Sequence, residues 1–327
     1  MVRHAYNPRP MIRILAVGDV VGRPGRDVLA YFLPLLREER GLDFVVVNAE
    51  NAASGSGITP KIYKQMREMG VDVLTMGDHA YKRRESLPLY DSETRLLRPS
   101  NWPQTSPGRG VCVAETARGV RVGVIHLQGK VFMNAQGDFF EEAEKQLRAL
   151  KGKTDVIVVD MHAEASSEKV ALSWFLDGRV SLVFGSHTHV PTADATIRPK
   201  GTAYITDCGM TGPYDSVIGR IKEAVLKKMR TNVHEPFTVA TGDARLGGAY
   251  VEVDERTGRA HSIEGLWLPL PAGAGSARLA SSRPWMACSP LANSRATSKE
   301  SCARASRRSR CAARSRSPAR RDRATST

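Results

Sequence analysis

The sequence is poor in cysteine and contains no long apolar run. Its 327 residues include only 5 cysteines, and their spacing matches no zinc-binding pattern. We interpret this low cysteine content as typical of a reducing compartment. No apolar run approaches the roughly 18 residues that a membrane helix needs, and the first ten residues, MVRHAYNPRP, lack the apolar core of a signal peptide. We therefore expect a cytoplasmic protein with no membrane partner.

Positive charge is concentrated at the C-terminal end of the chain. The formal net charge is +14, which would normally suggest a nucleic acid or a membrane as partner, but residues 272–327 alone contribute +11. This end of the chain consists mainly of Ala, Ser, Arg, Gly and Pro and cannot bury enough apolar surface to offset the entropy of ordering. We predict a disordered tail. Its composition also resembles an out-of-frame reading of a GC-rich gene, which intact-mass measurement on the natural protein would test.

Strand-like and helix-like segments alternate through the rest of the chain. Predicted strands begin at Met11 and lie at 44–50, 71–77, 111–114, 121–127, 155–160, 180–184, 202–206 and 248–253, and predicted helices lie at 28–40, with a kink at Pro34, and at 60–69, 139–150 and 167–176. This alternation indicates an α/β fold in which helices cover the outer faces of the sheets. We predict an N-terminal extension at 1–10, one domain at 11–270 and the tail at 271–327.

Polar and ionisable residues stand at the ends of five of the apolar strands. In open α/β sheets, ligands bind beyond the carboxyl ends of the strands, so residues far apart in sequence can meet there. Carboxylates together with imidazoles suit Mn, Fe or Zn. Residues i and i+2 of an extended segment face the same side, so two histidines that are two apart can reach one cavity. The residues are Asp19, Glu50, Asn51, Asp78, His79, His162, His187 and His189.

Each of these residues has a plainer explanation when it is taken alone. An aspartate after a glycine at a strand end, such as Asp19, is more often a helix cap or a turn residue. Burying so many ionisable groups together is costly unless metals or partners compensate, so the set as a whole favours a metal centre. The glycine-rich segment 18–25 lacks the Lys-Ser/Thr of a P-loop, which argues against nucleotide binding of that kind.

Seven motifs together resemble one enzyme family. They are GDVVGRPGRD (18–27), NAENAASGSGIT (48–59), MGDHAY (76–81), RPSNWP (98–103), DMHAEASSEK (160–169), GSHTHVPTAD (185–194) and GTAYITDCGMTGPYDSVIG (201–219). From Met11 to about Leu268 the chain resembles the YmdB-type branch of the calcineurin-like metallophosphoesterases. The resemblance implies a four-layer αββα sandwich. It also implies hydrolysis of small phosphodiesters such as 2′,3′-cyclic nucleotides, by attack of a metal-bound hydroxide at two ions of Fe or Mn.

The same resemblance assigns roles to the strand-end residues. It implies that Asp19, Glu50, Asn51 and His189 hold the first metal, and that Glu50, Asp78, His162 and His187 hold the second. His79 would be the general acid, with an orienting role as the alternative. Ligating imidazoles usually donate their other N–H to a partner, so we interpret Asp160 and Glu164, near His162, as such partners rather than as metal ligands.

The chain departs from the family pattern at one ligand position. The family has asparagine in its Gly-Asn-His motif, whereas this chain has Asp78, and Tyr81-Lys82 stand where the family tends to have Trp-Asp. A carboxylate at position 78 can still bind metal, but it adds negative charge where an anionic phosphate must approach. The departure therefore puts turnover in doubt more than metal binding.

Three functions follow from these observations. The first is a dinuclear metal-dependent phosphodiesterase acting on a small phosphodiester. The second is a metal-containing regulatory protein that binds a phosphorylated ligand or RNA with little turnover. The third is nucleic-acid binding through the Arg-rich tail, although Trp285 is the only aromatic residue there. The sequence leaves RNA and a second copy of the chain open as partners.

Overall fold

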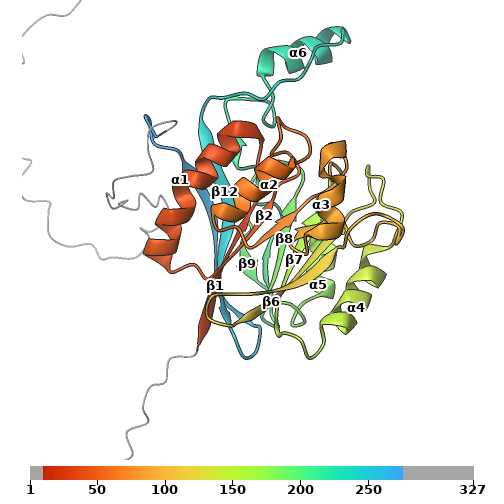
Figure 1. Ribbon diagram of the computed structural model, residues 1–327, viewed down its shortest axis with the longest axis vertical. Helices are drawn as coiled ribbons and strands as arrows, with labels where there is room; N and C mark the ends of the chain where they lie inside the picture. Colours follow the sequence, from red (N-terminus) through yellow and green to blue (C-terminus); the bar gives the residue numbers. More distant parts are fainter. Residues whose placement is uncertain (1–9, 275–327) are drawn as a thin grey trace, which may run out of the picture. The chain divides into compact units, whose positions relative to one another are not determined.

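The computed structural model describes residues 10–274, which form two β-sheets flanked by helices (Figure 1). Residues 1–9 and 275–327 lie outside the described residues, and so do the predictions made for the N-terminal extension and for the tail. The elements are β1 (Met11–Val17), α1 (Gly22–Arg40), β2 (Phe44–Asn48), α2 (Pro60–Glu68), β3 (Val73–Thr75), the 3₁₀ turn Arg84–Ser86, α3 (Leu87–Ser92), β4 (Leu96–Leu97), β5 (Val111–Glu115), β6 (Arg121–Gln128), α4 (Phe139–Leu150), β7 (Val156–His162), α5 (Ser166–Phe175), β8 (Leu182–Ser186), β9 (Thr196–Ile197), β10 (Ala203–Ile205), β11 (Gly212–Pro213), α6 (Lys222–Thr231), β12 (Ala244–Asp254) and β13 (Ala260–Pro269).

Parallel strands form the centre of both sheets. In the first sheet the order is β11-β12-β1-β2-β3-β4, with β13 also paired to β12, and β1 to β4 run parallel to one another. In the second sheet the order is β5-β6-β7-β8-β10-β9, and β6, β7, β8 and β10 are parallel. Antiparallel strands lie on both sides of each parallel segment except beside β4. In each sheet, the carboxyl ends of the parallel strands therefore share one edge.

Three apolar clusters separate the layers. On β1 the side chains alternate, so that Ile14 lies in a cluster between the two sheets and Leu15 lies in a cluster with helix α1. The third cluster joins the outer face of the second sheet to α4 and α5, for example through Val159 and Leu172. Helix, sheet, sheet and helix thus follow one another, which confirms the predicted four-layer αββα sandwich.

The helices that the sequence predicted are present, and apart from the start of α1 their boundaries differ from the prediction by at most one residue. Helix α4 has the predicted bounds, because Asp138 caps its first turn by accepting hydrogen bonds from the N–H groups of Phe140 and Glu141 at 2.8 and 3.0 Å. Helix α1 begins at Gly22, not at residue 28, and continues through Pro34. Its first turn carries Gly25, where a Cβ would collide with the carbonyl oxygen of Thr211. The backbone of Thr211 thus lies so close that position 25 has room only for glycine. The first turn of α1 therefore shows no apolar periodicity in the sequence.

Strand β13 and helices α3 and α6 were not predicted. Strand β13 pairs along its length with β12, but among its residues only Leu266 is buried, so the pattern of alternating burial is weak. Helix α6 likewise buries only Val225. Both elements lack the apolar face from which the other elements were identified.

Two further observations concern the cysteines and the helices of the described residues. Cys112 and Cys208 carry free thiols, and burial raises the pKa of Cys112 to about 12 and that of Cys208 well above its ordinary value. Both thiols are therefore protonated at neutral pH. Within residues 10–274, no helix has the length and apolar character needed to cross a membrane.

Candidate metal centre

The two sheets contribute different chemistry to a common site at their carboxyl ends. Asp19, Glu50 and Asp78 follow strands β1, β2 and β3 of the first sheet. His162 is the last residue of β7, and His187 follows β8, so these imidazoles come from the second sheet. Carboxylates from one layer therefore meet imidazoles from the other.

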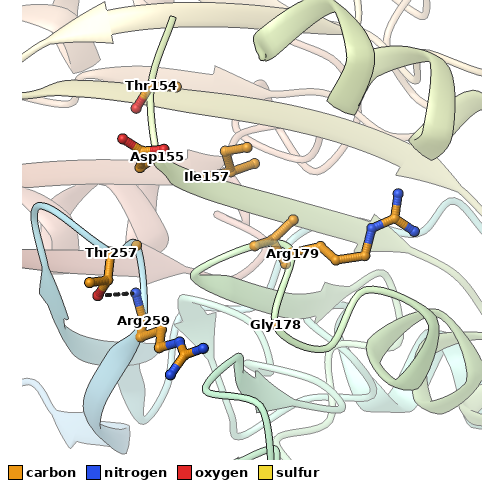
Figure 2. A pocket seen from close by; sticks show the side chains of 9 residues that line it. Thr154, Asp155, Ile157, Gly178, Arg179, Thr257 and Arg259 are labelled. Atoms are coloured by element: carbon orange, nitrogen blue, oxygen red, sulfur yellow. Dashed lines mark hydrogen bonds between the residues drawn. The ribbon is translucent and has the colours of Figure 1, made fainter. Parts of the chain in front are cut away.

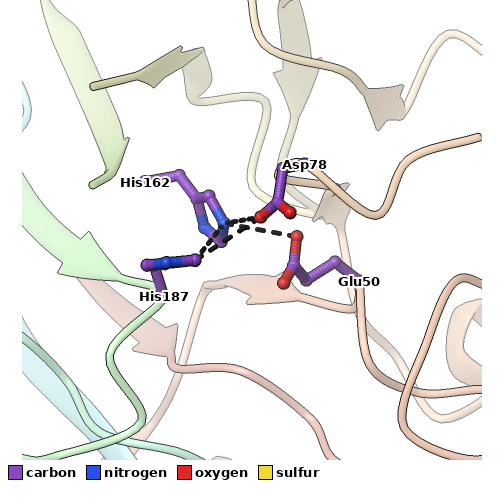
Figure 3. Close-up of side chains that lie close together, drawn as sticks. All are labelled: Glu50, Asp78, His162 and His187. Atoms are coloured by element: carbon purple, nitrogen blue, oxygen red, sulfur yellow. Dashed lines mark hydrogen bonds and ion pairs between the residues drawn. The ribbon is translucent and has the colours of Figure 1, made fainter. Parts of the chain in front are cut away.

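Four side chains form a compact cluster, which Figure 3 shows converging from three sides. They are Glu50, Asp78, His162 and His187, and each offers a ligand atom within 4.8 Å of the others. His162 Nε2 lies 3.2 Å from Glu50 Oε2 and 3.2 Å from Asp78 Oδ1. His187 Nδ1 lies 3.1 Å from His162 Nε2, so the two imidazole nitrogens are close enough to bind one cation together. This cluster has the members that the resemblance implies for the second metal.

A second group of polar side chains adjoins this cluster through Glu50. The amide of Asn51 donates from Nδ2 to Glu50 Oε1 at 3.0 Å and lies 3.1 Å from His189 Nε2. Asp19 Oδ1 lies 3.8 Å from the same His189 nitrogen. The other oxygen of Asp19, Oδ2, accepts from the backbone N–H of His187 at 3.0 Å. The residues expected around the first metal are therefore neighbours, with the amide oxygen of Asn51 turned toward His79.

One atom in this group lacks a hydrogen bond. Asp19 is fully buried, and its Oδ1 has no hydrogen-bond partner within the described residues. A buried carboxylate oxygen without a partner costs free energy unless an ion compensates, and its surroundings of carboxylate, amide and imidazole suit Mn or Fe. The residues present therefore fit a bound metal.

His79 lies beside the cluster with part of its side chain exposed to solvent. Its backbone N–H donates to Glu50 Oε2 at 3.2 Å, and its Nδ1 lies 2.9 Å from Asn51 Oδ1 and 3.3 Å from Glu50 Oε1. Its Nε2 is 3.8 Å from Asp78 Oδ2. The ring is thus held by its Nδ1, and its side chain is 28% exposed, which suits a proton donor that must reach a substrate.

Charges in the cluster shift several pKa values. Burial opposes ionisation of Glu50, yet the adjacent His162 and His79 outweigh burial and lower the pKa of Glu50 to about 2. Burial likewise opposes protonation of His162, but Glu50 and Asp78 raise its pKa to about 10. The same two carboxylates overcome burial to raise the pKa of His79 above 6.5. Without metal, the ionised carboxylate of Glu50 therefore faces the protonated imidazole of His162.

The loop that carries His187 and His189 is not extended as the sequence analysis assumed. The φ angles are +96° at His187 and +66° at His189, which are left-handed values that side chains larger than glycine adopt at a cost. Both imidazoles still reach the site, where His187 contacts His162 and His189 contacts Asn51. A turn in the backbone therefore brings them there, and the i, i+2 rule for extended segments was the wrong reason.

Buried residues that the sequence analysis did not identify hold this loop. Asp207 Oδ2 accepts hydrogen bonds from Thr188 Oγ1 at 2.8 Å and from Lys169 Nζ at 2.6 Å. Lys169 and Asp207 are each only 1% exposed. Nothing in the spacing of Lys169 along α5 distinguished it from a surface lysine, so its burial could be seen only in three dimensions.

The outer nitrogens of the imidazoles also have partners. His162 Nδ1 lies 2.9 Å from Ser186 Oγ, which donates to Asp160 Oδ1 at 2.7 Å. His187 Nε2 lies 3.2 Å from Glu164 Oε2. Such contacts orient metal-binding imidazoles, which is the role expected for Asp160 and Glu164. Asp160 acts on His162 through Ser186, and Glu164 contacts His187.

A pocket of about 470 Å³ adjoins the cluster, and Asp78 and His187 are part of its lining. A smaller pocket of about 180 Å³ lies at the amino end of β7, at the opposite end of that strand from His162 (Figure 2). Arg179 lines the smaller pocket, but its guanidinium forms an ion pair with Glu144 at 2.6 Å. Only the larger pocket has the volume typical of a small-molecule site, so we place the candidate site there.

Known sequences and structures include relatives of this chain. The family model described as "YmdB-like protein" matches residues 15–266. The chain is 45% identical over 253 residues to the 2′,3′-cyclic-nucleotide 2′-phosphodiesterase of Bacillus subtilis (strain 168), and the match covers 77% of this chain and 96% of that protein.

Two solved structures are similar over the same region. A hypothetical protein from Thermus thermophilus is 40% identical with a TM-score of 0.74, and the match covers 80% of this chain and 100% of that one. A novel phosphatase from Mycoplasma pneumoniae is 35% identical with a TM-score of 0.75, and the match covers 80% of this chain and 94% of that one. At these identities the likeness extends beyond the fold to the family.

Proposed function

Since the chain belongs to the YmdB-like family, we propose that it is a phosphodiesterase that hydrolyses 2′,3′-cyclic nucleotides with two ions of Fe or Mn. The observation that carries the proposal is the four-residue cluster of Glu50, Asp78, His162 and His187 beside a pocket. The name of the Bacillus subtilis relative supports the choice of substrate. Asp19, Asn51 and His189 complete the proposed ligand set, and Glu50 joins its two halves.

The side chains of the site have distinct tasks in this proposal. Two bound cations would activate a water molecule and offset the negative charge that develops on the phosphoryl group. Glu50 presents one oxygen to each half of the site, because Oε2 faces His162 and Oε1 faces Asn51. His79 holds a proton that it can give to the leaving ribose oxygen, and its contacts with Glu50 keep the ring in place.

Steady-state hydrolysis of 2′,3′-cAMP tests the proposal. With Mn²⁺ or Fe²⁺ added, we expect turnover to the ring-opened nucleotide, and we expect His162→Ala to lower turnover by at least about 100-fold because it removes an imidazole from the centre of the cluster. His261→Ala, which changes an exposed histidine on β13, is the matched control and should leave turnover unchanged.

Two outcomes would count against the proposal. Absence of turnover in the protein with both metals bound would favour the alternative of a regulatory metal protein that binds a phosphorylated ligand. Equal turnover in the His162→Ala variant would show that the hydrolysis takes place at another site.

Replacing His79 with glutamine is expected to lower kcat by about 100-fold while metal content stays unchanged. The reason is that a general acid must be protonated, and glutamine has no proton to give to the leaving oxygen. The rate of the unaltered enzyme should therefore fall as the pH rises through the pKa of His79, and the His79→Gln variant should lack that fall. Rates measured from about pH 5 to about pH 9 check both points. A variant with normal kcat would leave His79 only an orienting role.

Replacing Asp78 with asparagine is expected to raise kcat/KM for 2′,3′-cAMP by roughly 5-fold, because one negative charge is removed from a partly solvated site that must accept an anion. The same change should weaken metal binding, since a carboxylate binds a cation more strongly than an amide oxygen. Kinetics at saturating Mn²⁺ and elemental analysis of the dialysed protein measure the two effects. An unchanged kcat/KM would mean that the carboxylate is a tolerated ligand.

A further inference from the structure

The pocket beside the metal cluster is larger than a phosphate group needs. Its volume of about 470 Å³ is in the range of sites that hold a whole small molecule, and Asp78 and His187 belong to both the pocket and the cluster. A phosphodiester bound at the cluster would therefore have its remaining atoms in this pocket. The lining beyond the cluster includes the aromatic rings of Tyr81, Trp102 and Phe132.

Trp102 is a fixed part of the lining. Its indole Nε1 donates to Gln128 Oε1 at 2.8 Å, and Gln128 is only 1% exposed. Its ring also contacts the ring of Tyr81 edge to face, with centroids 5.3 Å apart. Tyr81 in turn donates from its hydroxyl to the carbonyl of Pro107 at 2.6 Å. The indole thus keeps its position without any ligand.

Phe132 is exposed and has an unusual backbone conformation. Its side chain is 92% exposed, although it lines the pocket, and its φ is +60°, which is uncommon and costly for a bulky residue. The loop of residues 129–138 that carries it is anchored at both ends. Lys130 N–H donates to Glu168 Oε1 at 2.9 Å, and Gly137 N–H donates to the carbonyl of Asn101 at 3.0 Å. The chain therefore holds an apolar ring in solvent at the edge of the pocket.

We propose that this pocket binds the base of a nucleotide, with Phe132 stacking on the base and Trp102 forming a fixed wall. The inference rests on the proposed hydrolysis of cyclic nucleotides and adds the part of the substrate that is recognised. A stacked base would remove the exposed ring of Phe132 from water, which explains why the loop presents it there. The exposed amides of Asn134 and Gln136 in the same lining offer donors and acceptors to the edge of a base, and they suit a base better than an apolar lipid chain.

A pair of substrates with the same reacting group tests the base site. One is 2′,3′-cAMP, and the other is ribose 2,3-cyclic phosphate, which lacks the base. Phe132→Ala is expected to lower kcat/KM for 2′,3′-cAMP by about 10-fold, mainly through KM, and to change the value for the base-free substrate by less than about 2-fold. Phe132→Trp should restore most of the loss, because any aromatic ring can stack.

The neighbouring Val131→Ala is the matched control for damage to the loop. Val131 is 42% exposed and is not among the residues that line the pocket, so both substrates should be hydrolysed at the normal rate. Equal losses for both substrates in Phe132→Ala, or no loss for either, would overturn the base site.

A binding measurement separates the base site from the proposed reaction. Adenosine 3′-monophosphate is titrated into the metal-loaded protein, with ribose 3-phosphate as the base-free ligand. If the unaltered protein hydrolyses neither substrate but binds the nucleotide in a way that depends on Phe132, the base site stands and the proposed hydrolysis falls. If it hydrolyses both substrates equally well and Phe132→Ala changes nothing, the hydrolysis stands and the base site falls.

Discussion

Replacing Gly77 with alanine is expected to lower the affinity for metal by about 100-fold or more and to reduce hydrolysis in proportion, while the fold is kept. A Cβ at this position would lie closer than 3.0 Å to three ring atoms of His162, which real Cβ atoms do not do. The imidazole cannot move aside, because it is fully buried and its Nδ1 is held by Ser186. Because Gly77 has no side chain, the imidazole of His162 can occupy the space beside it.

Metal titration monitored by calorimetry, together with circular dichroism of the metal-free protein, measures the effect. Gly265→Ala is the matched control, since the nearest atom to its new Cβ would be Ile205 Cδ1 at 3.6 Å, an ordinary contact. If Gly77→Ala binds both metals with normal affinity, then His162 has room that the structure does not show, and the steric explanation of this glycine is wrong.

Replacing Lys169 with methionine is expected to lower the free energy of unfolding by about 3–5 kcal/mol. The ammonium group donates to Asp207 at 2.6 Å, and both side chains are 1% exposed, so the substitution leaves a carboxylate in the interior without its counter-ion. Asp207 also accepts from Thr188, in the middle of the loop that carries two imidazoles of the site. We therefore expect weaker metal binding together with the lower stability.

Urea unfolding of the metal-free protein gives the free energy. Lys145→Met is the comparison, because Lys145 pairs with Glu142 at 3.1 Å on the surface with its side chain 49% exposed, and such pairs contribute at most about 1 kcal/mol. A loss below about 1 kcal/mol for Lys169→Met would mean that Asp207 finds another partner. A double change of Lys169 to methionine and Asp207 to leucine should recover part of the stability, because no charge is then left buried.

The sequence predicted the central strands better than the elements at the edges of the layers. Strand β7 and helix α4 were identified from apolar runs and spacing, since their burial is one-sided or complete. Strand β13 was missed because its exposed residues interrupt that pattern. Burial decides which segments leave a signal, so elements at the edge of a layer are the ones that sequence patterns miss.

The geometry of the site depended on facts that no local pattern contains. The sequence placed polar residues at the ends of five strands, and four of these residues form a cluster in the structure: Glu50, Asp78, His162 and His187. It could not show that His187 and His189 have left-handed backbone angles. Nor could it identify Lys169 or Phe132, because their importance comes from what lies beside them in space.

The separation of the two sheets sets the distance between the acidic and the basic halves of the site. Glu50 and Asp78 follow strands of one sheet, and His162 and His187 belong to the other, so the apolar layer between the sheets acts as a spacer. Phe44 and Phe184 are fully buried in that layer. A change in the volume of either ring would alter the spacing of the ligand atoms from a distance. The fit of any metal held by the proposed ligands would therefore depend partly on core residues in the layer between the sheets.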